Sequence, residues 1–207
     1  MSVRVGYMPG AFPEGEEGVD YLKRLVQVGD EYGYDSIWLS DRVVGERFSP
    51  EPLIALAMVA AYSDTMKFGT SVLQVPIRNP VVLAKEMATL DYLSNGRFLP
   101  AIGLGQEDPR EYEACGVSKE DRGRRTDEAM TVMRRLWQED NVTHEGDFFT
   151  LHDVTVTPKP AQLPNLAVWI GGRSPAAQRR VGRVGDGWLV SSATPDEIAE
   201  GIELIFS

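Results

Sequence analysis

Residues 67–104 read KFGTSVLQVPIRNPVVLAKEMATLDYLSNGRFLPAIGL, and they contain the pattern that decides the fold. Residues 67–75 are rich in apolar and β-branched side chains, which is typical of a buried strand. Residues 80–93 place apolar side chains at helical spacing and are closed by the helix-stop sequence SNG. Residues 98–104 are apolar again. The unit predicts two parallel strands joined by a crossover helix.

The same alternation of short apolar runs and helical patterns extends along the chain, except in one segment. We expect strands at residues 3–8, 36–40, 67–75, 98–104, 166–170 and 187–191. We expect helices at residues 18–32, 52–62, 80–93, 121–137 and 195–206, and another from about 175. The exception is residues 140–164, which are rich in turns and alternate like an exposed β-ribbon. We interpret this segment as an excursion from the main architecture.

Strict alternation of buried strands and helices is typical of an α/β protein with a parallel sheet. The first strand is not followed by a nucleotide-binding fingerprint, so the pattern favours a TIM-type (β/α) barrel over a doubly wound sheet. A complete barrel has eight βα units, whereas this chain shows about six. We therefore expect one domain over residues 1–207, a barrel truncated to about six units with its C-terminal units missing.

Composition argues against several classes of protein. Of the 207 residues, 43% are hydrophobic, which is enough to bury a sizeable core. The 21 Lys and Arg residues against 31 Asp and Glu give a net charge of −10, which argues against binding to nucleic acids or anionic membranes. Cys115 is the only cysteine, so no disulfide can form within the chain. With no leader-like start and no apolar run of membrane-spanning length, we expect a soluble cytoplasmic protein.

In a (β/α) barrel, functional groups gather where the strands end and the following loops begin. After the fifth expected strand, Gly171, Gly172, Arg173 and Ser174 precede a helix. Glycines allow the backbone to approach a ligand closely, and the helix N-terminus with the donors of Arg173 and Ser174 would make a cradle for phosphate or carboxylate. A tight turn with a surface arginine explains the same residues, so the pattern leaves both readings open.

The fourth expected strand ends in GLGQEDP, which lacks the Gly-Lys-Ser/Thr of a P-loop. The open backbone around Gly105 suits a flat ring lying over the strand ends. Glu107 is either a general acid or base or a solvated loop residue. The basic cluster of Arg122, Arg124 and Arg125 is explained by a solvated helix start or by a side chain that reaches a cofactor tail.

Metal-dependent and serine-hydrolase chemistry find no support in the sequence. His144 and His152 both fall in the excursion, away from the strand ends. The sequences HxH, HExxH and CxxC do not occur, so we expect no metal site. The GxSxG elbow of many hydrolases is also missing.

Several stretches, in family order across nearly the whole chain, resemble the luciferase-like monooxygenase superfamily, the flavin- and deazaflavin-dependent barrels related to bacterial luciferase. They are DSIWLSD, the block at residues 69–105, LWQEDNVTHEGDFFTL, PKPAQLPNLAVWIGGRSPAAQRRVGRVGDGW and PDEIAEGI. The block at 69–105 is the most specific. GGRSP together with GDGW is more similar to the branches that use coenzyme F-420, a deazaflavin, than to the luciferases themselves.

The resemblance implies a barrel in which the isoalloxazine-like ring of the cofactor lies over the strand ends. It also implies a non-prolyl cis peptide between Ser71 and Val72 that supports this ring from behind. Asp41 and Gln74 match positions that contact the ring. The turn at residues 171–173 matches the turn that holds the phosphate of the cofactor tail.

The chain departs from the family pattern at the two residues that we consider as catalytic candidates, Arg42 and Glu107. Many deazaflavin enzymes carry histidine where this chain has Arg42. Arginine stays protonated, so Arg42 would stabilise an anionic ring or substrate rather than act as a base. The glutamate that some relatives carry near the fourth strand matches Gln106 more closely than Glu107.

We interpret the sequence as a flavin-type oxidoreductase, with coenzyme F-420-dependent hydride transfer to or from a small organic substrate as the leading hypothesis. One alternative is an FMN-dependent monooxygenase that uses reduced flavin from a separate reductase. Another is a non-catalytic flavoprotein or an inactive barrel fragment. Relatives are often homodimers, so we expect a homodimer. If the barrel is genuinely incomplete, a partner chain must cover the open edges of the first and sixth strands.

Overall fold

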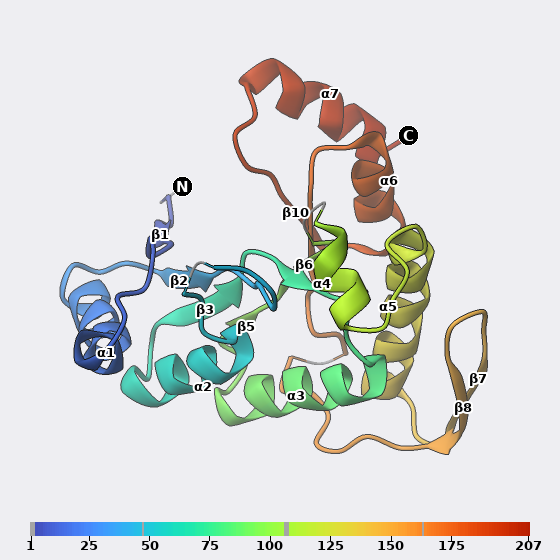
Figure 1. Ribbon diagram of the computed structural model, residues 1–207, viewed down its shortest axis with the longest axis horizontal. Helices are drawn as coiled ribbons and strands as arrows, with labels where there is room; N and C mark the ends of the chain where they lie inside the picture. Colours follow the sequence, from blue (N-terminus) through green and yellow to red (C-terminus); the bar gives the residue numbers. More distant parts are fainter. Residues whose placement is uncertain (1–2, 47, 106–107, 163) are drawn as a thin grey trace.

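The computed structural model describes residues 3–46, 48–105, 108–162 and 164–207. Its centre consists of two four-stranded parallel sheets with helices packed along their outer side (Figure 1). The first sheet contains β1 (Gly6–Tyr7), β2 (Ser36–Leu39), β3 (Lys67–Thr70) and β5 (Phe98–Leu99), and the second contains β4 (Leu73–Gln74), β6 (Ala101–Gly103), β9 (Trp169–Gly171) and β10 (Gly187–Leu189).

Two of the predicted strands are each divided into two parts. The peptide bond between Ser71 and Val72 is cis and separates β3 from β4, while Pro100 separates β5 from β6. Proline has no amide hydrogen to donate to a neighbouring strand, which explains the second interruption. β3 pairs with β2 and β5, β4 pairs with β6, and β6 continues to β9 and β10, always in parallel. When β3 with β4 and β5 with β6 are each taken as one divided strand, the described residues form six parallel strands in chain order, which confirms the predicted (β/α)-barrel architecture.

The helices are α1 (Glu16–Glu31), α2 (Pro52–Tyr62), α3 (Pro80–Leu93), α4 (Pro109–Ala114), α5 (Arg122–Gln138), α6 (Pro175–Val184) and α7 (Pro195–Ile205). Five of them begin at a proline, whose fixed backbone angle suits the first helical turn. In each of these five, the preceding residue accepts a hydrogen bond from the first turn: Glu51, Asn79, Asp108, Ser174 and Thr194. The short α4 was not predicted, although Asp108 and Pro109 supply both of these signals.

The predicted excursion contains an antiparallel hairpin of β7 (Val142–Glu145) and β8 (Thr150–Val154), which projects beside α5 in Figure 1. Glu128 on α5 anchors it, because its carboxylate accepts hydrogen bonds from the backbone amides of Phe148 and Phe149. His144 on β7 lies 3.2 Å from the same carboxylate. This carboxylate therefore attaches the hairpin to α5.

The apolar core lies between the sheets and their helices. Phe68 on β3 stacks on Phe98 on β5 with ring centroids 6.0 Å apart, and both side chains are fully buried. Leu56 of α2 and Met87 of α3 close this layer from the helical side. Such burial is the main stabilising contribution to a fold of this size. Within the described ranges, every helix is too short or too polar to span a lipid bilayer.

Candidate active site

A cavity of about 800 Å³ lies at the carboxyl ends of the parallel strands. It is lined from β1, β2, β4, β6, β9 and β10 and from the loops that follow them. The lining includes every residue that the sequence assigned to cofactor binding: Asp41, Ser71, Val72, Gln74, Gly105, Gly171, Gly172, Arg173 and Ser174. Residues that are spread over more than half of the chain thus line the same cavity.

Val72 forms part of the cavity floor. The cis peptide bond that the family resemblance implied is present between Ser71 and Val72. A Cβ atom on Gly103 would stand 2.6 Å from Val72 Cγ2, and one on Gly171 would stand 2.5 Å from Val72 Cγ1. Both distances are too short for any side chain, so glycines flank Val72 on both sides. The result is a smooth floor of backbone and one branched side chain, on which a flat ring can lie.

Asp41 is held under the rim of the cavity by an ion pair. Its side chain is 1% exposed, and its Oδ2 lies 2.9 Å from the backbone nitrogen of Gln74 and 2.9 Å from Arg78 Nη2. The same Nη2 lies 3.1 Å from Glu51 Oε1. Burial raises the pKa of Asp41 above its ordinary value, although the charge of Arg78 opposes the effect. The sequence did not lead us to expect a role for Arg78. The only hint of one is that a charged residue interrupts the largely apolar segment VPIRNP.

Gln74 ends β4 with its side chain 2% exposed. Its side-chain Nε2 donates to the carbonyl oxygen of Asp41 at 3.2 Å and to Glu111 Oε1 at 3.1 Å. Gln74 Oε1 is buried and accepts no hydrogen bond from any described residue. An unpaired buried acceptor is unfavourable, and this one belongs to a residue of the cavity wall. A bound ring with an N–H donor fits this position.

Gly105 makes this arrangement of Gln74 possible. Its backbone has a φ of +90°, which favours glycine, and a Cβ atom there would overlap Gln74 Oε1. The sequence predicted an open backbone at this position. The structure adds the reason, which is the close approach of the glutamine side chain.

The GGRS turn brings the start of α6 to the cavity. Gly172 has a φ of +121°, and Ser174 caps the helix because its Oγ accepts from the Ala177 amide at 3.2 Å. Pro175 has no amide hydrogen and the Ala177 amide is used by the cap, so the preference of this end for an anion comes from the helix dipole and the Ala176 amide. The turn that the sequence predicted as an anion cradle therefore does line the cavity, with Ser174 itself occupied as a cap.

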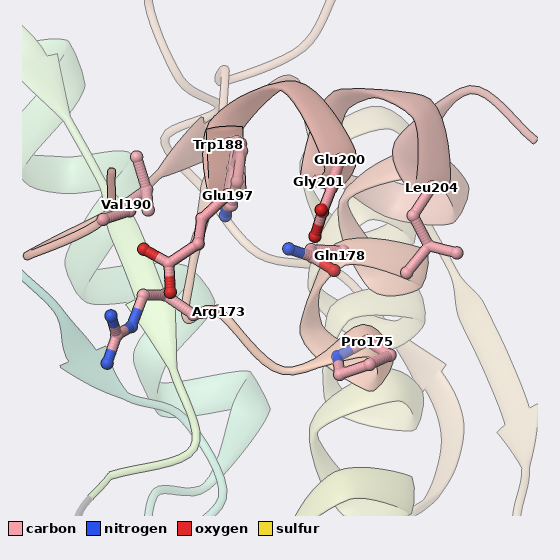
Figure 2. Close-up of a pocket in the computed structure, with 10 residues that line it drawn as sticks. Arg173, Pro175, Gln178, Trp188, Val190, Glu197, Glu200, Gly201 and Leu204 are labelled. Atoms are coloured by element: carbon pink, nitrogen blue, oxygen red, sulfur yellow. The ribbon is translucent and has the colours of Figure 1, made fainter. Parts of the chain in front are cut away.

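Arg173 stands between this cavity and a second one of about 390 Å³ beside α7 (Figure 2). Its Nη1 donates to the carbonyl oxygen of Ser192 at 2.6 Å. Glu197 of α7 also lines the second cavity. Hydrogen bonds from Thr194 lower the pKa of Glu197, and the positive charge of Arg173 adds to this effect. Arg173 thus holds its positive charge at the edge of the GGRS turn, where both cavities meet it.

Arg42, one of the two catalytic candidates, does not line the main cavity. Arg42 lines a separate hollow of about 300 Å³, where its Nε donates to the carbonyl oxygen of Val44 at 2.8 Å. Glu107 lies outside the described residues. Arg122, in contrast, does line the main cavity, whereas Arg125 donates to the carbonyl oxygen of Pro76 at 2.9 Å. Of the basic cluster, Arg122 is therefore placed to meet a ligand.

Comparisons with known proteins agree with this geometry. A family model described as luciferase-like monooxygenase matches residues 3–206. An F420-dependent glucose-6-phosphate dehydrogenase of Kineococcus radiotolerans is 37% identical over 171 residues, which are 79% of this chain and 50% of that protein. Monooxygenase RslO1 from Streptomyces bottropensis is 25% identical with a TM-score of 0.87, over 99% of this chain and 64% of that one.

A further solved structure is an F420-dependent secondary alcohol dehydrogenase in complex with an F420-acetone adduct. It is 25% identical with a TM-score of 0.81 and covers 98% of this chain and 64% of its own. The chain thus spans between half and two thirds of the length of these three proteins.

Proposed function

Because the chain belongs to the luciferase-like monooxygenase family, we propose that its strand-end cavity binds coenzyme F-420 and serves hydride transfer to or from a small organic substrate. The observation that carries this proposal is the single cavity shared by all the residues assigned to cofactor binding. The F420 dependence of the dehydrogenase from Kineococcus radiotolerans and of the secondary alcohol dehydrogenase supports the choice of cofactor.

The deazaflavin, when bound, supplies the hydride chemistry, and the protein supplies binding and orientation. Val72 would support the flat ring, and Gln74 would offer it an acceptor. The turn at Gly171 and Gly172 and the start of α6 would hold the phosphate of the tail. Arg173 adds a positive charge at the same end of the cavity.

An FMN-dependent monooxygenase is the second candidate function. The likeness to monooxygenase RslO1 favours it, and the floor around Val72 would support an FMN ring equally well. This function would require reduced flavin from a separate reductase. The two candidates differ in the cofactor that binds, so a binding measurement separates them.

The test is a titration of the purified protein with F-420 and, separately, with FMN, followed by fluorescence. Tight binding of F-420 without FMN supports the deazaflavin proposal, and the reverse supports the monooxygenase. Binding of neither contradicts both. Arg173→Ala should weaken F-420 binding about tenfold, since it removes one charged contact to the phosphate.

Arg179→Ala is the matched control for Arg173→Ala. It removes an exposed arginine from α6, the helix that follows Arg173, at a position that does not line the cavity. Its F-420 affinity should equal that of the wild-type protein. If Arg173→Ala also keeps wild-type affinity, the GGRS turn is not the phosphate site.

A further inference from the structure

Glu111 on α4 is a fully buried carboxylate, which is costly unless hydrogen bonds compensate for the lost water. Its Oε1 accepts from the backbone amides of Val43 at 2.7 Å and Val44 at 3.2 Å. The same oxygen accepts from Gln74 Nε2 at 3.1 Å. Three donors from two other parts of the chain therefore meet at one atom of α4.

These donors belong to two segments at the cavity rim. Val43 and Val44 lie in the loop that follows Asp41, and Gln74 is the last residue of β4. Hydrogen bonds to a charged acceptor are about twice as strong as neutral ones. Glu111 thus fixes the loop after β2 relative to β4, although it does not itself line the cavity.

Glu111 also determines the orientation of the Gln74 amide. The Gln74 nitrogen faces two groups that can only accept hydrogen bonds, Glu111 Oε1 and the carbonyl oxygen of Asp41. The Gln74 Oε1 atom must therefore point the other way, toward the space above Gly105. There it has no partner among the described residues. The unpaired atom of this cavity-lining side chain is consequently an acceptor rather than a donor.

We propose that Glu111 is a positioning residue that holds Gln74 as an acceptor for the imide N–H of a flavin-type ring. The inference rests on the proposed function. An oxidised flavin or deazaflavin has a single ring N–H, which lies between two carbonyl groups. A glutamine that presented its NH₂ group would instead favour the carbonyl oxygens on either side.

Three variants and two ligands test the role of Glu111. Glu111→Ala removes the acceptor, Glu111→Gln retains a carbonyl oxygen in its place, and Glu113→Gln changes an exposed glutamate of the same helix. The ligands are F-420 and its derivative methylated on the imide nitrogen. Affinities are measured by fluorescence titration, and thermal unfolding confirms that each variant is folded.

The wild-type protein should bind the methylated ligand at least about tenfold more weakly than F-420, because methylation removes the N–H. Glu111→Ala should lose this discrimination and bind F-420 about tenfold more weakly. Glu111→Gln should keep most of it, and Glu113→Gln should match the wild type. Equal binding of the two ligands by the wild type, or unchanged discrimination in folded Glu111→Ala, overturns the inference.

Hydrogen exchange in the cofactor-free protein tests the positioning of the rim without any ligand. The Val43 and Val44 amides should be protected in the wild type and in Glu113→Gln, and should exchange at least about tenfold faster in Glu111→Ala. Unchanged exchange overturns the positioning role. If the wild type binds neither F-420 nor FMN, the proposed function fails and the acceptor role of Gln74 fails with it. The exchange result then still decides whether Glu111 positions the rim.

Discussion

Replacement of Arg78 by methionine should destabilise the protein by about 3 kcal/mol at pH 8. Methionine keeps much of the apolar stem of Arg78 and removes the charge that pairs with Asp41. The Asp41 side chain is 1% exposed and that of Arg78 is 18% exposed, so this ion pair is largely buried. Breaking a buried pair costs about 3–5 kcal/mol. The lower end of this range applies here, because Asp41 keeps its hydrogen bond from the backbone amide of Gln74. The second acid that pairs with Arg78, Glu51, is 35% exposed, so water can solvate it when Arg78 is removed.

The loss of stability should depend on pH in a definite direction. Burial already raises the pKa of Asp41, and the charge of Arg78 opposes that shift. Removal of Arg78 therefore raises the pKa of Asp41 further. An acid whose pKa is higher in the folded than in the unfolded state contributes stability at low pH, which is lost as the pH rises through the folded pKa. The Arg78→Met variant should accordingly lose less stability at pH 5 than at pH 8.

Urea unfolding followed by tryptophan fluorescence at both pH values measures this difference. About 3 kcal/mol corresponds to a decrease of about 6–12 °C in Tm for a chain of this size. Arg110→Met is the control, because Arg110 is 75% exposed and pairs with Asp108. Hydrogen bonds from Arg110 lower the pKa of Asp108 to about 2, well below the tested range, so the control should behave alike at both pH values. An equal or larger loss for Arg78→Met at pH 5 would refute the reasoning.

Three further changes have defined outcomes. Gly105→Ala should destabilise the protein by about 1–2 kcal/mol because of the positive φ, and should weaken F-420 binding because the new Cβ overlaps Gln74 Oε1; urea unfolding and fluorescence titration check both effects. Burial raises the pKa of Tyr7 to about 12, so alkaline titration by ultraviolet absorbance should show a late phenol that Tyr7→Phe lacks. The stability from that phenol is complete below pH 10 and is lost as the pH rises through 12. Thr194→Ala breaks the capping box of α7 and should cost about 1 kcal/mol, measured as a lower midpoint of urea unfolding.

The order of the barrel elements could be predicted because each strand and helix leaves its own periodicity in the sequence. The division of the fourth strand could also have been predicted, since Pro100 cannot donate to a neighbouring strand. The helix α4 could not be found by periodicity, because six residues give fewer than two turns. Asp108 and Pro109 were its only local signals. The cis bond at Ser71 came from the family resemblance alone, since no local pattern indicates it.

The sequence predicted which residues lie at the strand ends, but it did not predict which side chains pair with each other in the site. Residues at strand ends converge by topology, which is why the expected cofactor contacts share one cavity. The buried pair of Asp41 and Arg78 joins residues 37 positions apart, and so does the contact of Gln74 with Glu111. No spacing rule connects such residues. The placement of Arg42 was partly foreseeable, because successive side chains of an extended segment point in opposite directions.

The described wall of the cavity is better suited to holding a ring than to moving a proton. Its titratable residues, within the described ranges, are Tyr7, Asp41, Arg122 and Arg173. Tyr7 has a pKa of about 12 and donates to the carbonyl oxygen of Leu25, and arginines stay protonated near neutral pH. Asp41 is already engaged by two donors. A hydride transfer that also moves a proton therefore needs an acid or base other than these four residues.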